Sequence, residues 1–263
     1  MHEIYAIRYG HLDRTSDENF LGGDDHAGPM PLDYYVWVIK GNGRTIVVDT
    51  GFDATAAMRR GRTLIRPVAE GLAAINVDPR EVLDVVITHM HYDHAGNAAL
   101  FPRARFHLQD AEMAWCTGRA MTHRHLSAAF AADDVAGMVH LVFEGRVSFC
   151  EGVSDVWAGV MLHRLPGHTP GLQAVRVETA RGPVVLASDA AHFWANLERE
   201  TPYPIVADVA EYLDSQRVLR GLAPSIDHII PGHDPAVLAR FPKPPGVRDI
   251  VRVDLAPAAQ DTT

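Results

Sequence analysis

The sequence predicts a layered α/β or α+β fold, and two kinds of segment support this prediction. Short runs rich in Val and Ile, bounded by Gly, Pro, Asn or Asp, have the composition of β-strands. Other stretches repeat apolar residues three and four positions apart, which is the periodicity of helices. Because the two kinds alternate and no linker divides the chain, we expect a single domain over residues 1–263.

The strand-type runs differ in how they are expected to be buried. Residues 44–50 and 82–89 contain continuous apolar cores, which indicates strands covered on both faces, whereas residues 172–179 alternate and should be half exposed. Asp208 can cap the third of the expected helices. The expected strands are 3–9, 34–40, 44–50, 82–89, 104–109, 160–165, 172–179, 182–189 and 226–232, and the expected helices are 67–75, 109–115 and 208–223.

Two segments lack such regularity. Residues 10–33 are polar and Gly-rich, and a loop of this length is usually functional, so we expect it on the substrate side of a binding site. Residues 243–263 are rich in Pro and Ala and are expected to form a C-terminal tail outside the core.

The composition argues against several classes of protein. A formal net charge of −9 with no Lys/Arg-rich run is a poor match for nucleic acid as the main partner. Cys116 and Cys150 are too few and too far apart for a disulfide framework or a cysteine-based zinc site. No signal peptide and no apolar run of ~20 residues is visible, so we expect no membrane association. These features predict a cytoplasmic protein, as a monomer or homodimer.

Residues 88–97, THMHYDHAGN, crowd four ligand-type side chains into six positions directly after a strand-type run. Neutral imidazoles and a carboxylate suit zinc, with iron and manganese as alternatives. Without a metal, such a group would leave polar atoms clustered without partners. We therefore expect His89, His91, Asp93 and His94 to bind metal.

Three further candidates lie downstream, each at the end of a strand-type run. His168 lies in LPGHTPG, Asp189 follows PVVLAS, and His233 lies in IIPGHDP. One edge of a sheet could present these three residues beside the first four. Seven ligands are more than one metal needs, so the set predicts two ions.

The motifs HMHYDH, PGHTPG, SDA and PGHDP, preceded by VDTG at 48–51, resemble in their order those of the metallo-β-lactamase superfamily. The resemblance runs from residue 34 to about residue 240. It implies an αββα sandwich with a two-metal site at one edge of the two sheets. It also implies a first metal on His89, His91 and His168, a second on Asp93, His94 and His233, Asp189 as a bridge, and Asp49 as a residue that supports the metal loop.

Such a site predicts hydrolysis. Two zinc ions lower the pKa of a shared water, so a bridging hydroxide can attack a carbonyl at neutral pH. Asp93 could then carry the proton to the leaving group. The GxSxG motif of serine hydrolases is absent, and no serine nucleophile is required.

The group of the superfamily that this chain resembles most is that of the N-acyl homoserine lactonases. The length, the seven-ligand pattern and the early loop are similar, and the resemblance implies a small lactone substrate and quorum quenching. One position departs from the group: His192 stands where these lactonases have a tyrosine that bonds the lactone oxygen. We expect His192 to contact the substrate and act in catalysis, with Phe193 and Trp194 as an apolar wall.

Other activities stay open at this point. The substrate could be another small catabolic ester, an amide or a thioester, the last as in glyoxalase II-type enzymes. A metal-binding or redox protein without hydrolytic activity is the remaining alternative, although a complete two-metal site favours activation of water.

Overall fold

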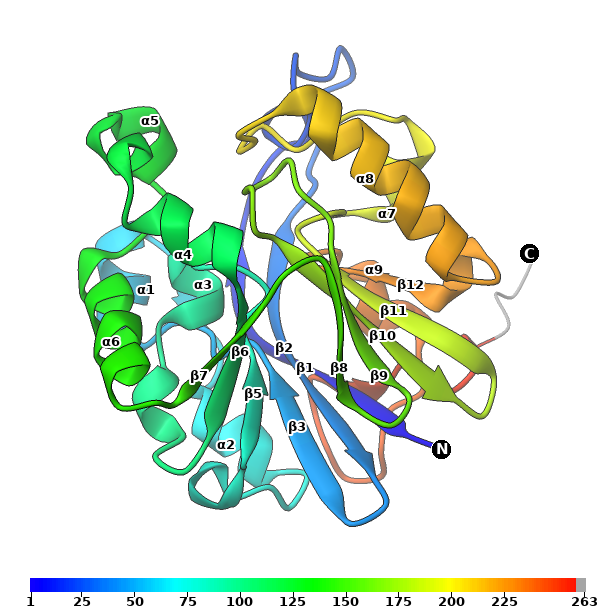
Figure 1. Ribbon diagram of the computed structural model, residues 1–263. Helices are drawn as coiled ribbons and strands as arrows, with labels where there is room; N and C mark the ends of the chain where they lie inside the picture. Colours follow the sequence, from blue (N-terminus) through cyan, green and yellow to red (C-terminus); the bar gives the residue numbers. More distant parts are fainter. Residues whose placement is uncertain (259–263) are drawn as a thin grey trace.

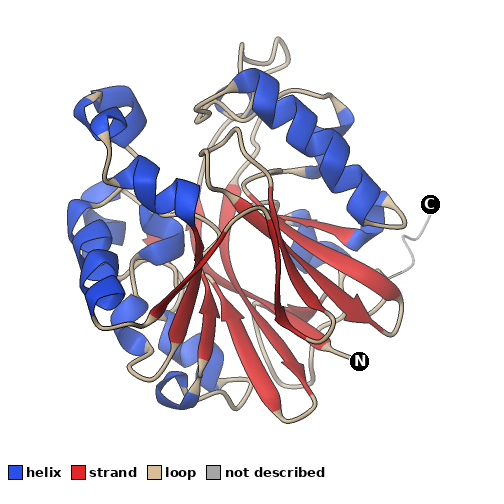
Figure 2. Ribbon diagram, viewed as in Figure 1, coloured by secondary structure: helices blue, strands red, loops and turns tan. Residues whose placement is uncertain are grey.

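The computed structural model describes residues 1–258, and in it two β-sheets face each other between two layers of helices (Figure 1; Figure 2). Helices α1 to α4 and α6 lie on the outer side of the first sheet, α5 protrudes beyond α4, and helices α7 to α9 lie on the side of the second sheet. This is the αββα arrangement that the motifs implied, and the prediction of the fold is confirmed.

The first sheet contains both long antiparallel strands and a parallel half. Its order is β13-β1-β2-β3-β5-β6-β7, with β4 paired to β1. Strands β3, β5, β6 and β7 run parallel to one another. The bounds are β1 Glu3–Leu12, β2 Leu32–Gly41, β3 Arg44–Val48, β4 Thr63–Leu64, β5 Asp84–Val86, β6 Arg105–Gln109, β7 Val147–Cys150 and β13 Ile250–Arg252.

The second sheet has the order β12-β11-β10-β9-β8. Only β11 and β12 are parallel in this sheet, and the other pairs are antiparallel. Its strands are β8 Val153–Trp157, β9 Val160–Arg164, β10 Gln173–Thr179, β11 Gly182–Ser188 and β12 Ile229–Pro231.

The longest helix, α8 (Val209–Leu222), begins as the sequence predicted, because the Asp208 carboxylate accepts a hydrogen bond from Glu211 N at 2.9 Å. Short helices make up most of the remaining helical structure. They are α1 Ala54–Arg60, α2 Val68–Ala73, α3 Tyr92–Ala95, α4 Asp110–Cys116, α5 Arg124–Ser127, α6 Ala132–Phe143, α7 Trp194–Glu198 and α9 Ala236–Arg240.

The core lies both between the sheets and under the helices. Trp37 and Val48 of the first sheet pack with Leu186 of the second in one buried cluster. Strands β3 and β5 are covered on both faces, as their continuous apolar sequence predicted. Strand β10 differs from the expectation: only Glu178 is exposed on it, because helix α8 lies over its outer face.

Two boundaries predicted from composition need correction. The loop expected over 10–33 is shorter than predicted, because β1 extends to Leu12 and β2 begins at Leu32. The expected tail at 243–263 contributes strand β13, which pairs with β1 and buries Ile250 and Val251 in the core; only 259–263 lie outside the described residues. Within residues 1–258, none of the helices is long and apolar enough to cross a membrane.

This topology brings several strand ends to one edge. The carboxyl ends of the parallel strands β3 and β5 meet at one edge of the first sheet, and those of β11 and β12 meet at one edge of the second. The loop between β9 and β10 reaches the same region (Figure 1). Every segment that carries a predicted metal ligand therefore converges there.

Candidate metal centre

The structure brings all seven predicted ligands together, although they come from four separate segments of the sequence. All seven residues are buried. His89 lies in the loop after β5, His91 precedes α3, Asp93 and His94 lie in α3, His168 lies between β9 and β10, Asp189 follows β11, and His233 follows β12.

A first group consists of three imidazoles that point ring nitrogens at one another. His91 Nδ1 lies 3.0 Å from His89 Nε2 and 3.0 Å from His168 Nε2. At most one of two facing nitrogens can donate to the other, so three converging nitrogens cannot satisfy one another with protons alone. This donor set suits a divalent cation such as zinc.

A second group contains two imidazoles and a carboxylate. Asp93 Oδ2 lies 3.7 Å from His94 Nε2 and 3.9 Å from His233 Nε2. His94 Nε2 is buried, and although Asp189 Oδ1 lies 3.3 Å away, no atom within residues 1–258 has the geometry of a hydrogen bond to it. A buried imidazole nitrogen without a partner is the state that a metal ion would relieve.

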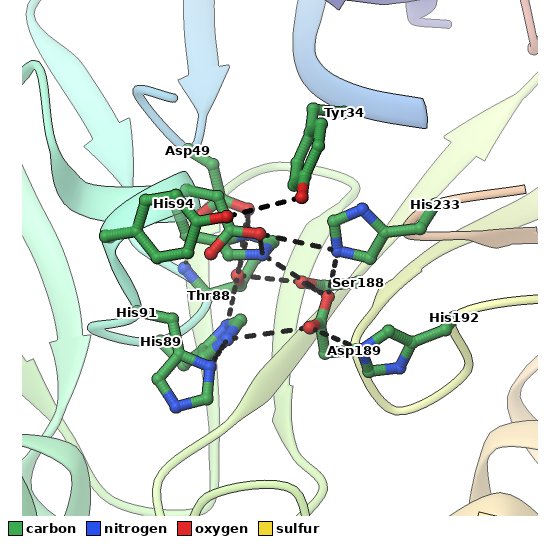
Figure 3. A network of polar contacts seen from close by, with 12 residues as sticks. Tyr34, Asp49, Thr88, His89, His91, His94, Ser188, Asp189, His192 and His233 are labelled. Carbon is green, nitrogen blue, oxygen red and sulfur yellow. Dashed lines mark hydrogen bonds and ion pairs between the residues drawn. The ribbon is translucent and has the colours of Figure 1, made fainter. Parts of the chain in front are cut away.

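Asp189 joins the two groups through its two carboxylate oxygens (Figure 3). Its Oδ2 lies 3.2 Å from His168 Nε2 and 3.7 Å from His89 Nε2. Its Oδ1 faces the other group, at 3.0 Å from His233 Nε2 and 3.3 Å from His94 Nε2. One carboxylate therefore offers an oxygen to each group, as a bridge between two ions requires.

Hydrogen bonds on the far side of the rings set the orientation of three histidines. His168 Nδ1 donates to Ile205 O at 2.6 Å, and His233 Nδ1 donates to Asp33 O at 2.9 Å. His94 Nδ1 donates to Asp49 at 2.7 Å. These bonds place a proton on Nδ1 and leave the Nε2 lone pair directed inward, where a metal ligand needs it.

The electrostatics of the site favour a bound cation. Burial, together with the neighbouring histidines, lowers the pKa of His89 and His91 well below the usual value, so both rings are neutral ligands. Burial acts in the same direction on His94, but Asp189, Asp93 and Asp49 outweigh it and raise its pKa well above the usual value. The same negative charges that favour an extra proton on His94 would also favour a metal ion beside it.

Asp49 lies outside the group of ligands and holds the loop that carries them. It accepts hydrogen bonds from Thr88 N at 2.7 Å and from Thr88 Oγ1 at 2.8 Å, besides the one from His94. Its backbone has a φ of 62°, in the left-handed region that few non-glycine residues adopt. This turn at the end of β3 directs the carboxylate toward the metal loop.

His192 points into the site, whereas its two neighbours do not. His192 Nε2 lies 3.0 Å from Asp189 Oδ2 (Figure 3), and its ring stacks on Tyr203 with centroids 3.7 Å apart. Phe193 and Trp194, which the sequence predicted as an apolar wall, are not among the residues that line the cavity. Phe193 and Trp194 are buried in the core, and the Trp194 indole donates to Ile229 O at 2.9 Å, away from the cavity.

Besides Asp49, a second buried carboxylate supports the metal loops, and the sequence did not point to it. Glu112 of helix α4 accepts hydrogen bonds from Met90 N at 2.8 Å and from Thr169 Oγ1 at 2.6 Å, so it ties the first metal loop to the loop of His168. A charged residue on an apolar helix face was the available signal. Sequence reasoning also missed polar residues that line the cavity over the metal groups, namely Arg14, Tyr34, Arg62, Tyr92 and Tyr203.

Comparison with known proteins agrees with this geometry. The family model of the metallo-β-lactamase superfamily matches residues 30–233. An N-acyl homoserine lactonase of Bacillus sp. is 29% identical over 189 residues, which cover 65% of this chain and 70% of the relative.

Solved structures share the fold. A quorum-quenching N-acyl homoserine lactone lactonase superposes with a TM-score of 0.73 at 24% identity, over 89% of this chain and 92% of the other. The dizinc quorum-quenching lactonase AidC, with its product bound, does so with a TM-score of 0.68 at 17% identity, over 89% and 88%. The chain with this two-group site therefore belongs to the metallo-β-lactamase superfamily and is a hydrolase of that family.

Proposed function

We propose that the protein opens a lactone or a similar small cyclic ester with the help of two bound zinc ions. The observation that carries this proposal is the position of Asp189, whose two oxygens face two separate groups of ligands. The names of the relatives support a lactone as the substrate. N-acyl homoserine lactones, and with them quorum quenching in the cytoplasm, are the first activity to test.

The seven ligands would form two metal positions. His89, His91 and His168 would hold one ion, Asp93, His94 and His233 the other, and Asp189 both. Bound there, the two ions would lower the pKa of a shared water and polarise the substrate carbonyl. In the net reaction the oxygen of water bonds to the carbonyl carbon, the ring C–O bond breaks, and the ring oxygen needs a proton.

Asp93 is the group that we assign to this proton transfer. Asp93 lines the cavity together with Asp189 and His233, close to where the water and the leaving oxygen would be. A carboxylate in this position can take a proton from water and return it to the ring oxygen.

His192 is the group that we assign to the substrate carbonyl or leaving oxygen. Burial lowers its pKa to about 3, so the ring is neutral and carries one N–H. Nε2 is within hydrogen-bond distance of Asp189 and lines the same cavity, which supports donation from Nε2. A donor that tightens in the transition state contributes roughly 2–4 kcal/mol.

Metal analysis followed by a substrate panel tests the proposal. We expect two zinc ions per chain and turnover of lactones that a chelator abolishes. The panel contains N-acyl homoserine lactones, simple γ- and δ-lactones, thioesters and phosphodiesters. Faster turnover of thioesters or phosphodiesters than of any lactone would overturn the proposal, and so would a metal content that never exceeds one ion.

His192 needs a separate test. His192→Ala should keep both metals and lower kcat ~30- to 1,000-fold, the loss expected for an oxyanion-type donor. His192→Tyr should recover part of this loss, because the phenol is also a donor. Near wild-type kcat/KM in the alanine variant would show that His192 does not act on the substrate.

A further inference from the structure

Two arginines line the cavity over the metal groups without forming an ion pair among the described residues. Arg14 comes from the segment between β1 and β2, and Arg62 from the turn between α1 and β4. Both line the cavity that also contains Asp93 and Asp189. Among the described residues neither guanidinium forms an ion pair, and their hydrogen bonds go to neutral oxygens.

The neutral partners leave donors unused on both side chains. Arg14 donates to the Tyr203 hydroxyl and, at 2.6 Å, to Glu18 O, while its Nε is buried and finds no partner in the part of the chain that the structure describes. Arg62 donates from Nε to the Tyr92 hydroxyl at 3.0 Å and from Nη1 to a backbone carbonyl. A buried donor without an acceptor costs free energy, which a ligand can recover.

Each arginine is one or two aromatic rings away from the metal groups. Tyr203, which accepts from Arg14, stacks on His192 with centroids 3.7 Å apart. Tyr92, which accepts from Arg62, has its hydroxyl 3.3 Å from that of Tyr34, and the Tyr34 ring meets His233 edge-on. The two positive charges are therefore held in place at the rim of the reaction site.

The charge and the size of the cavity indicate what it accepts. The chain has a net charge of −9, yet two guanidiniums that form no ion pair among the described residues line this cavity, where Asp93 and Asp189 would be occupied by the metal ions. Burial lowers the pKa of Arg14 although the charge of Glu18 opposes this, and the nearby charge of Arg62 acts in the same direction as burial. A bound anion would offset the repulsion between the two arginines. The cavity is small, about 60 Å³, and its aliphatic lining consists only of Leu32, Ala129 and Ile205.

From these observations we propose that the preferred substrate is a compact lactone or cyclic ester that carries a carboxylate beside the reacting bond, and that Arg14 and Arg62 bind this carboxylate. The inference rests on the proposed ester-opening function. Guanidinium groups match carboxylates in geometry, and such charge-assisted hydrogen bonds are stronger than neutral ones. The product would be a hydroxy dicarboxylate.

A matched pair of substrates tests this inference with the zinc-loaded protein. One is 5-oxotetrahydrofuran-2-carboxylate, and the other is its carboxamide, which has nearly the same shape and no charge. We expect kcat/KM of the wild type to favour the carboxylate at least about tenfold. In Arg14→Gln and in Arg62→Gln this preference should fall by about tenfold, whereas Arg217→Gln, on the exposed face of α8, should keep it.

Binding provides a second readout, independent of turnover and of the variants. Calorimetry with wild-type protein should show tighter binding of 2-hydroxyglutarate than of 4-hydroxybutanoate, which lacks the second carboxylate, and the difference should shrink as salt is added. Equal binding, together with equal turnover of carboxylate and carboxamide, would overturn the inference and leave the lactonase proposal intact. Turnover of thioesters but of no lactone would instead refute the proposed function, while the binding comparison would still test the arginine pair.

Discussion

Glu112 offers the sharpest test of how the metal loops are held. Its carboxylate is fully buried and accepts three hydrogen bonds, from Met90 N at 2.8 Å, Thr169 Oγ1 at 2.6 Å and Gly171 N at 3.2 Å. Met90 lies between two predicted ligands of the first metal, and Thr169 follows the third. Removal of this one side chain should therefore affect both stability and metal binding.

The structure allows the size of the effect to be worked out. Glu112→Ala leaves three buried donors without an acceptor, at about 1–3 kcal/mol each before water enters the space, so we expect a loss of about 4 kcal/mol in the free energy of unfolding. Glu112→Gln keeps one acceptor oxygen and nearly the same volume, and should cost about 2 kcal/mol. Affinity for the first metal should fall about 10- to 100-fold in the alanine variant, as for other residues that support ligands.

Two measurements check these values. Urea unfolding of metal-free protein gives the stability, and competition with a chromogenic chelator gives the zinc affinity. Glu198→Ala is the matched control, because Glu198 is exposed on α7 and should change neither quantity. The reasoning fails if Glu112→Ala stays within about 1 kcal/mol of the wild type and keeps its zinc affinity.

Three further predictions concern other parts of the molecule. Asp189→Asn should weaken both metals in elemental analysis, since its oxygens face both groups; loss of only one ion would argue against a bridge. Gly167→Ala should lower the free energy of unfolding in urea by about 3 kcal/mol, because at φ 130° a Cβ would lie 2.3 Å from Tyr212 N, and it should also lower the metal content. An unchanged midpoint of unfolding would contradict this. Burial and then the nearby Asp53 raise the pKa of Asp134 from 3.8 to about 6, so its charge destabilises the fold above that pH and not below pH 3.8. Asp134→Asn should therefore stabilise metal-free protein by about 1–2 kcal/mol at pH 8 and have little effect near pH 4, and an equal gain at both pH values would refute the assignment.

The sequence by itself was sufficient to predict those features that arise from residues close to one another in the chain. Four ligand-type residues in six positions identify a metal loop because the chain can turn them toward one point without help from elsewhere. The other three ligands could be found because each follows a strand-type run, and parallel strands end at a common edge. The ordered motifs then led to the family and to the αββα fold.

Only the tertiary structure decided which remaining residues face the site. Phe193 and Trp194 directly follow His192, yet the turn after Asp189 sends them into the core. Arg14 meets Tyr203 across 189 positions of sequence, and Glu112 meets Thr169 across 57.

Strand β13 shows the same limit for the fold. Its composition resembles a tail, and it becomes a strand because the edge of β1 offers it hydrogen-bond partners and an apolar surface. Contacts of this kind leave no local pattern, since their free energy comes from burial and hydrogen bonding between segments that meet only after the chain has folded. The metal ligands were therefore visible in the sequence, whereas the walls of the cavity, which select the substrate, were not.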